Sequence, residues 1–158
     1  MVSVQSSIHS AISIVNAIAT GKGATLGISK KIDIIIKELP GKGIVIESDG
    51  KTISSRLINE VIKQIIPANE LSKTKLKVSL NSEIPTGYGL KSSSAISSAV
   101  SLGCAKLFRP DMSETEILRI GVDASIKTKV SLTGAYDDAC ACYYGGFNVT
   151  DNYKKKII

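Results

Sequence analysis

The chain has 158 residues, of which 43% are hydrophobic and 22% charged, and its net charge is +6. That length fits one domain, and the balance of apolar and charged residues excludes a disordered or collagen-like chain. No apolar run approaches the roughly 18 residues that cross a bilayer, and no basic residue precedes the first apolar stretch as in a signal peptide. The sequence therefore predicts a cytoplasmic protein with no membrane partner.

The positive charge comes from 20 Lys and Arg residues against 14 Asp and Glu residues. Such an excess suits anionic partners such as nucleotides, acidic metabolites or RNA, but a solvated lysine-rich surface is the simpler interpretation. The three cysteines are an odd number, and Cys140 and Cys142 are too close in sequence to bridge easily. With a single histidine in the chain, reduced buried thiols are expected and a metal site built on them is not.

The first part of the chain predicts strands and one early helix. Residues 2–5 are expected to form a short edge strand, and the apolar spacing over residues 9–18 is compatible with a helix. Isoleucines alternate with charged residues over 26–39, which predicts a half-buried strand. A Pro-Gly turn at 40–43 followed by the apolar run 44–47 predicts a hairpin with that strand.

The next elements are a helix and a strand. One apolar face predicts a helix from Ser55 that ends before Pro67, and alternation predicts a strand over 74–84. A loop rich in glycine and serine then leads into a helix of small residues, which the Arg-Pro-Asp sequence at 109–111 ends.

The last third is expected to be mainly helical. Ser113 and Glu116 have the spacing of a capping box at a helix start. Residues 131–138 are predicted as a polar loop before a short helix, 143–150 as the last strand, and the lysines at 154–156 as a frayed tail. Strands early and helices late, with one helix between, indicate the α+β class rather than alternating α/β.

The loop at residues 85–95, between a predicted strand and a helix start, has the features of an anion site. First-turn amides of a helix lack intrahelical partners, and the helix dipole places partial positive charge there. Gly87 and Gly89 let the backbone approach a ligand, the serines at 92–94 supply hydroxyls, and Lys91 adds a charge. A capped helix after a glycine turn is the purely structural alternative, and the loop lacks the Walker A pattern.

Within this loop, Pro85-x-x-x-Gly89-Leu90-Lys91-Ser92-Ser93-Ser94 resembles the PxxxGLGSSA phosphate loop of the GHMP kinases, the superfamily of galactokinase, homoserine kinase and mevalonate kinase. Lys91 departs from that pattern, since a second glycine usually stands there. Two further segments share the resemblance, Ile-Ala-Thr-Gly-Lys-Gly-Ala at 18–24 and Leu-Thr-Gly-Ala-Tyr-Asp-Asp-Ala-Cys at 132–140. In this order and spacing the three resemble the archaeal-type shikimate kinase family, over residues 14–146.

The resemblance implies a two-layer α+β fold, in which a mixed or antiparallel sheet packs on helices as in the related ribosomal-protein domain. Residues 1–158 would form the GHMP kinase N-terminal domain. ATP and Mg²⁺ would be the cofactors. The reaction would phosphorylate the 3-hydroxyl of shikimate and give shikimate 3-phosphate, a step toward chorismate and the aromatic amino acids. The late glycine-rich motif of the family's C-terminal domain is not found in the chain, so impaired activity is expected, with the missing domain or another chain needed to cover the site.

The resemblance also assigns roles to residues. Asp137 would deprotonate, polarise or orient the substrate hydroxyl, and Lys22 would neutralise the substrate carboxylate or the transferred phosphoryl group. The ATP phosphates are expected at Pro85, Gly87, Gly89, Leu90, Lys91, Ser92, Ser93, Ser94 and Ala95. Shikimate is expected at Asn16, Thr20, Gly21, Gly23, Tyr136 and Asp138. Mg²⁺ is expected at Ser93, with Asp123 as the second choice.

Other interpretations of these residues stay open. Asp137 and Asp138 could cap a helix, Lys22 could be a solvated turn residue, and Asp123 could pair with Lys127 one turn later. Another GHMP small-molecule kinase, such as a homoserine kinase, is the nearest alternative function. A non-enzymatic RNA-binding domain of the same fold is the second, but only five Tyr and two Phe are available for base stacking, so no nucleic-acid partner is predicted.

Overall fold

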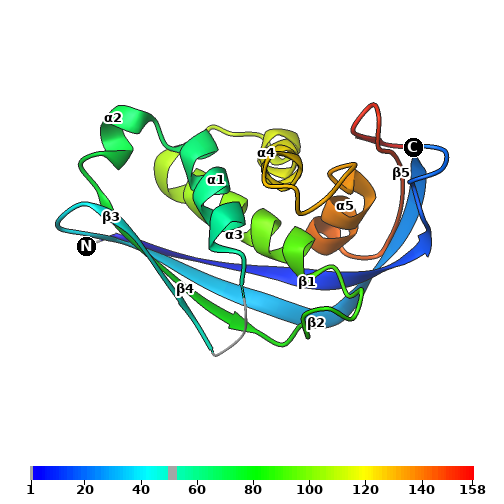
Figure 1. Ribbon diagram of the computed structural model, residues 1–158, viewed down its shortest axis with the longest axis horizontal. Coiled ribbons are helices and arrows are strands. Elements are labelled where there is room, and N and C mark those ends of the chain that lie inside the picture. Colours follow the sequence, from blue (N-terminus) through cyan, green and yellow to red (C-terminus); the bar gives the residue numbers. More distant parts are fainter. Residues whose placement is uncertain (1, 50–52) are drawn as a thin grey trace.

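A twisted six-stranded sheet carries the helices on one face in the computed structural model, which describes residues 2–49 and 53–158 (Figure 1). The strands are β1 (Ser3–Val15), β2 (Lys22–Leu39), β3 (Gly43–Ser48), β4 (Lys75–Ser82), β5 (Phe147–Asp151) and β6 (Lys156–Ile157). The helices are α1 (Ser55–Ile65), α2 (Ala68–Leu71), α3 (Ser92–Phe108), α4 (Glu114–Lys127) and α5 (Tyr136–Tyr144). The parallel pair β3–β4 among antiparallel pairs makes the sheet mixed, so the predicted two-layer α+β class is confirmed.

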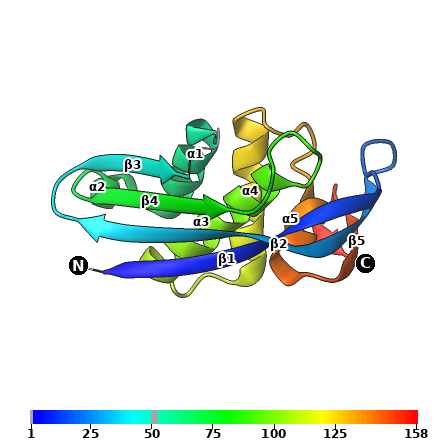
Figure 2. The ribbon, with the colours of Figure 1, turned by 90° about the horizontal axis from the view of Figure 1, so that it is seen from below.

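The long strand β2 organises the sheet. β1 pairs along one edge of β2, while the opposite edge is shared by two strands, β4 against residues 32–39 and β5 against residues 22–26. The sheet therefore has two ends, with β3 and β4 at one and β5 and β6 at the other, and the chain termini lie far apart (Figure 2).

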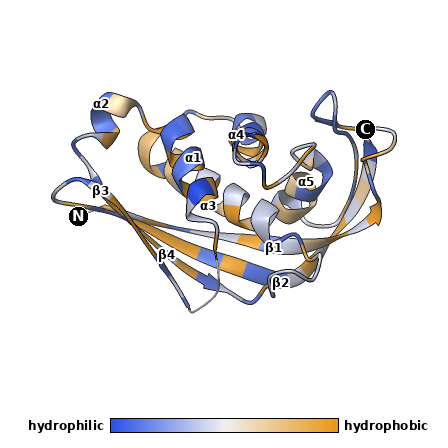
Figure 3. Cartoon of the chain, viewed as in Figure 1, coloured by the Kyte–Doolittle hydropathy of each residue, from blue (hydrophilic) through white to orange (hydrophobic). Residues whose placement is uncertain are grey.

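Apolar and polar residues alternate along β2 and β4, and the apolar ones form the core. Ile32, Ile34 and Ile36 are fully buried beneath the helices, and hydrophobic segments follow the same strands in Figure 3. Each fully buried side chain of this size contributes about 1.5–3 kcal/mol. A slip of one residue would turn Asp33 and its charged neighbours inward, so the pattern specifies the register strongly.

The helix expected over 9–18 is wrong, because residues 9–15 continue the edge strand into the 13-residue β1 and residues 16–18 lead into the turn after it. Its helix-facing positions include Ser6 and Ser10, which are buried although polar. The Ser6 hydroxyl donates to the Ala99 carbonyl of α3 at 2.8 Å, so a polar side chain replaces an apolar one without an unpaired group. Buried serines concealed the strand alternation from the sequence.

The hairpin between residues 26–39 and 44–47 is also wrong. Both strands exist, but β4 lies between them, and β3 pairs with β4 in parallel. The connection from β3 through α1 to β4 is a βαβ unit, in which the apolar face of α1 covers the sheet that its own flanking strands form.

The later elements match most expectations. The capping box of α4 forms, with Ser113 Oγ accepting from the Glu116 amide, a cap worth about 1 kcal/mol. The last strand begins at Phe147 rather than 143, because Tyr143 and Tyr144 still belong to α5. The tail lysines are ordered as well, since Lys155 pairs with Asp123 and the segment ends in β6.

The three cysteines are free and buried, as predicted. Across residues 2–49 and 53–158, none of the helices combines the length and apolar character that crossing a membrane requires.

Candidate active site

Two adjoining hollows lie where α3 and α5 begin. The carboxylate hollow, of about 190 Å³, is lined by Ser13, Asn16, Ala17, Ile18, Leu132, Thr133 and Asp137. The serine hollow, of about 250 Å³, is lined by Gly89, Leu90, Ser92, Ser93, Ser94, Ser125 and Val130. Lys91, Ser131, Ala135 and Asp138 line both, so the two hollows are neighbours with a shared wall.

The serine hollow is built on the start of α3. Lys91 occupies the N-cap position with a left-handed backbone (φ 58°) and provides no side-chain cap. The first-turn amides of α3 therefore stay available to a ligand, as in phosphate sites at helix starts. The Ser10 hydroxyl of β1 donates to the Leu90 carbonyl at 2.6 Å and attaches this loop to the sheet.

The carboxylate hollow is built on the start of α5. Its N-cap residue Ala135 also has a left-handed backbone (φ 50°) and no side-chain cap. Asp137 and Asp138 follow in the first turn, where the helix dipole favours negative charge. Both aspartates are buried, at 3% and 7% exposure.

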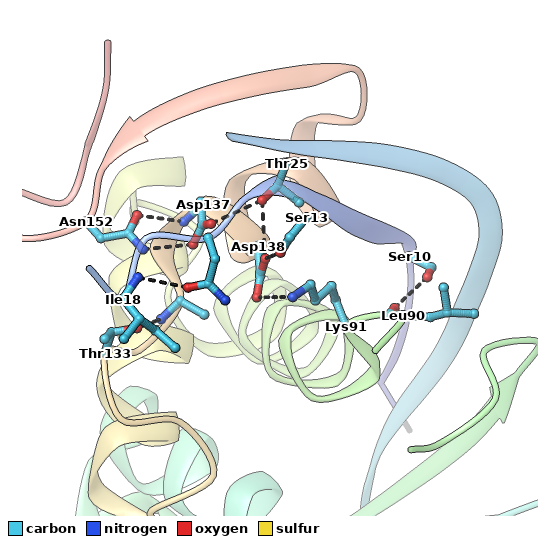
Figure 4. Close-up of polar contacts among 12 residues, drawn as sticks. Ser10, Ser13, Ile18, Thr25, Leu90, Lys91, Thr133, Asp137, Asp138 and Asn152 are labelled. Carbon is cyan, nitrogen blue, oxygen red and sulfur yellow. Dashed lines mark hydrogen bonds and ion pairs between the residues drawn. The ribbon is translucent and has the colours of Figure 1, made fainter. Parts of the chain in front are cut away.

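The Asp137 carboxylate is held by two donors. Its Oδ2 accepts from the Thr25 hydroxyl of β2 at 3.1 Å, and its Oδ1 accepts from the Asn152 amide at 2.8 Å (Figure 4). Gly23 of β2 lies directly against the carboxylate, and a Cβ there would overlap it. Asp137 is thus oriented by three residues from other parts of the chain.

The Asp138 carboxylate connects the two hollows. Its Oδ2 pairs with Lys91 Nζ at 3.2 Å, and its Oδ1 accepts from Thr25 at 3.3 Å and from Ser13 at 3.4 Å (Figure 4). Burial, and then the neighbouring charge of Asp137, raise the pKa of Asp138, while Lys91 opposes the increase. The departure from the family loop pattern at Lys91 thus places a cation beside the candidate catalytic carboxylates.

The structure brings many of the predicted site residues together. Those that line the two hollows are Asn16, Gly89, Leu90, Lys91, Ser92, Ser93, Ser94, Asp137 and Asp138. Gly23 contacts Asp137 from the side.

Other predicted residues lie outside the hollow linings. Lys22 is exposed, and because successive strand residues point to opposite faces, its side chain leaves β2 on the face opposite Gly23. Thr20 and Gly21 belong to the turn before β2, Pro85 and Gly87 to the outer part of the loop, and Ala95 to the core. Their roles stay predictions.

Two more candidates point elsewhere. Tyr136 packs with Leu118 and Val122 between α4 and α5, where burial raises its pKa to about 12. Asp123 pairs with Lys155 of the C-terminal segment, and Lys127, its expected partner, pairs with Glu60 instead.

Three residues that contact the aspartates were not predicted from the sequence. Ser13 and Thr25 lie on β1 and β2, more than 100 residues from the aspartates, and Asn152 lies beyond the next strand, β5. Only the folded sheet brings them together, and no local motif marks them. A polar residue at the buried position 25 of a strand is the sole signal that could have been noticed.

The family model for the GHMP kinases N terminal domain matches residues 56–146, more than half of the chain. The chain belongs to the GHMP kinases. The matched range includes the phosphate-loop resemblance, the whole of α3 and the first turn of α5, so it contains much of both hollows of this GHMP domain.

Similar proteins agree with that assignment. This GHMP domain is 37% identical over 151 residues to a shikimate kinase of Pyrococcus furiosus, covering 94% of this chain and 55% of the relative. It is 39% identical over 156 residues to a shikimate kinase of Methanocella arvoryzae, covering 95% and 51%. A crystal structure of homoserine kinase from Cytophaga hutchinsonii shares the fold, with a TM-score of 0.80, 18% identity, and 99% and 51% coverage. The chain spans about half the length of the curated relatives it matches.

The raised pKa of Asp138 has a consequence for stability. The folded domain holds this proton more tightly than the unfolded chain, so the free energy of unfolding should fall as pH rises from the ordinary aspartate range through the raised pKa. We expect Asp138→Asn to flatten this fall, because the variant has no proton to lose at position 138. Urea denaturation at several pH values measures it, with the exposed Asp111→Asn as control. Equal slopes for parent and Asp138→Asn would contradict the expectation.

Proposed function

We propose that this GHMP domain takes part in the ATP-dependent phosphorylation of the 3-hydroxyl of shikimate. The observation that carries the proposal is the adjacency of an uncapped helix start and a pair of buried aspartates across one shared wall. A kinase needs such an arrangement, since phosphoryl transfer depends mainly on positioning and on stabilising charge. Similarity to archaeal shikimate kinases supports shikimate as the acceptor.

In this proposal the ATP phosphates occupy the serine hollow. The free amides at the start of α3 donate to phosphate oxygens, and the hydroxyls of the serines at 92–94 add further donors. Lys91, at the wall between the hollows, exchanges its ion pair with Asp138 for the transferred phosphoryl group and stabilises the charge on it.

The acceptor alcohol occupies the carboxylate hollow. Asp137 accepts a hydrogen bond from the reacting hydroxyl and either removes its proton or holds it in line for attack on the γ-phosphorus. Asp138 contributes to the same wall. Ser13, Asn16 and Thr133 line the same hollow and would contact the other hydroxyls or the carboxylate of the acceptor.

Mg²⁺ fits the serine hollow in a limited way. In the described ranges, no three His, Cys, Asp or Glu side chains gather as a metal cluster. A magnesium ion held mainly by phosphate oxygens and water needs only one or two protein oxygens, and the Ser93 hydroxyl in the hollow is available. The bound ion would neutralise phosphate charge. Asp123 is a weaker candidate, because Lys155 already pairs with it.

The curated relatives are about twice as long as this chain, so we propose that residues 1–158 alone have weak turnover, and that the additional part completes the cover over the hollows. A test therefore needs both forms. Residues 1–158 would be assayed alone and in place of the corresponding residues of the P. furiosus relative; this second form is called the joined protein below.

The decisive assay measures ATP turnover by the joined protein with shikimate, homoserine and mevalonate. We expect turnover with shikimate alone, formation of shikimate 3-phosphate, and weak or absent turnover by residues 1–158. Turnover with homoserine and none with shikimate would overturn the substrate assignment. RNA binding that weakens steeply with salt, together with no ATP binding by residues 1–158, would overturn the kinase assignment.

A further inference from the structure

Asn152, directly after β5, is a buried polar residue with no assigned role in the proposed reaction. Its exposure is 5%, similar to the 3% of Asp137. Residues 137 and 152 are separated by the rest of α5 and by β5, and the contact exists because β5 returns beside β2 and passes the start of α5 (Figure 4).

Each polar atom of the Asn152 side chain has a partner. Nδ2 donates to Asp137 Oδ1 at 2.8 Å, while Oδ1 accepts from the Asp137 backbone amide at 3.1 Å and from the Thr150 hydroxyl at 2.7 Å. Because Nδ2 meets an acceptor and Oδ1 meets two donors, the amide has one satisfactory orientation. The side chain thus forms hydrogen bonds with both the carboxylate and the backbone amide of Asp137.

The backbone of Asn152 is itself held. Its amide donates to the Gly21 carbonyl at 2.7 Å, in the turn before β2. The next residue, Tyr153, lies with its ring against Gly21, where a Cβ would overlap the ring. Gly21 has φ +74°, a conformation that suits glycine, so the turn itself favours this close contact. An amide presented from a fixed backbone can orient its partner with little freedom.

We propose that Asn152 is the positioning residue for the Asp137 carboxylate. It acts by donating to Oδ1 and by satisfying the free Asp137 amide in the first turn of α5, while Thr25 holds Oδ2. The inference deepens the proposed phosphoryl transfer and rests on it. It assigns Asn152 a role through Asp137, without contact with the transferred group.

The chain offers a matched control in Asn148. Asn148 lies on β5, is 8% exposed, and its Nδ2 donates to the Gly145 carbonyl at 2.7 Å, at the opposite end of α5. Each variant therefore removes one buried asparagine side chain from on or directly after β5: Asn152 bonds to the first turn of α5 and Asn148 to the C-cap residue of the same helix. Only Asn152 contacts Asp137 among these two.

The test compares Asn152→Asp, Asn152→Ala and Asn148→Ala in the joined protein, with the alcohol that the parent phosphorylates. Loss of a residue that orients a metal ligand typically costs 10–100-fold, and we expect kcat to fall by a comparable factor in both Asn152 variants with little change in KM for ATP. In Asn152→Asp a second carboxylate would face Asp137, so the acid limb of the pH–rate profile should move to higher pH. Asn148→Ala should keep kcat within a few-fold of the parent and leave the limb in place.

An unshifted limb with kcat retained in Asn152→Asp, or an equal loss of kcat in Asn148→Ala, would overturn the inference. If the parent phosphorylates none of the alcohols, the proposed function fails, and hydrogen exchange of residues 1–158 decides the positioning role separately. Faster exchange of the Asp137 amide in Asn152→Ala but not in Asn148→Ala would support it. The same exchange rate in both variants would overturn it.

Discussion

Asp137→Asn in the joined protein should lower kcat by about 10²–10⁴-fold, the usual contribution of a general acid or base. The substitution keeps the size of the side chain and removes the charge that would polarise the acceptor hydroxyl. KM for ATP should change little, because Asp137 lines the carboxylate hollow and not the serine hollow. Steady-state kinetics with shikimate and ATP varied separately would measure both effects.

The control for this variant is Asp33→Asn, on the part of β2 that pairs with β4, away from both hollows. Its kcat should equal that of the parent. If Asp137→Asn kept kcat within a factor of about ten, Asp137 would not be the base or the principal positioning group. Asp138→Asn would then be the next variant to assay, since Asp138 lies in the same wall.

Gly23→Ala should lower kcat on the order of 10²-fold, the cost of moving a reacting group by about 1 Å. The new Cβ would overlap the Asp137 carboxylate, which Thr25 and Asn152 hold from two sides, so the carboxylate must move or the strand must shift. Overpacking of this kind also costs about 1–3 kcal/mol of stability. Kinetics and urea denaturation of the same samples would separate the two effects.

A double-mutant cycle makes the Gly23 expectation specific. If the alanine acts by displacing Asp137, it should lower kcat much less when Asp137 is already asparagine. The matched control is Gly121→Ala in α4, where a Cβ would meet Ser97 at 3.2 Å outside the aspartate cluster. Equal kcat losses for Gly23→Ala in both backgrounds would show that the glycine acts independently of the carboxylate.

Some residues of the site can be recognised from short sequence motifs, and others cannot. The phosphate-loop pattern at 89–94 and the adjacent aspartates were visible as motifs, because free helix amides and paired carboxylates depend on neighbours in sequence. The three residues that donate hydrogen bonds to the aspartates, Ser13, Thr25 and Asn152, were not predicted from the sequence. They come from β1, β2 and the end of β5, and their pairing with α5 exists only in the folded sheet.

The two lysines assigned to the site, Lys22 and Lys91, differ in where their side chains lie. The position of Lys22 between two glycines and the family resemblance predicted a cation facing the reacting groups. In the structure the side chain is exposed and lines neither hollow, and its role stays a prediction. Lys91, assigned only to phosphate binding, is the one of these two lysines that pairs with Asp138. Side-chain direction depends on strand alternation and on backbone conformation at the helix start, which a motif does not specify.

The sequence by itself determined the α+β class, most element positions and the family, because alternation, capping and glycine turns act over a few residues. The 158-residue length fitted one domain. The comparison with longer relatives added that the chain spans about half of their length. Only the tertiary structure decided that β4 separates β2 from β3, that buried serines continue β1 as a strand, and that Asn152 reaches Asp137. These features depend on contacts between different strands and helices. Such contacts form only when the sheet and the helices pack together, so no short stretch of sequence specifies them.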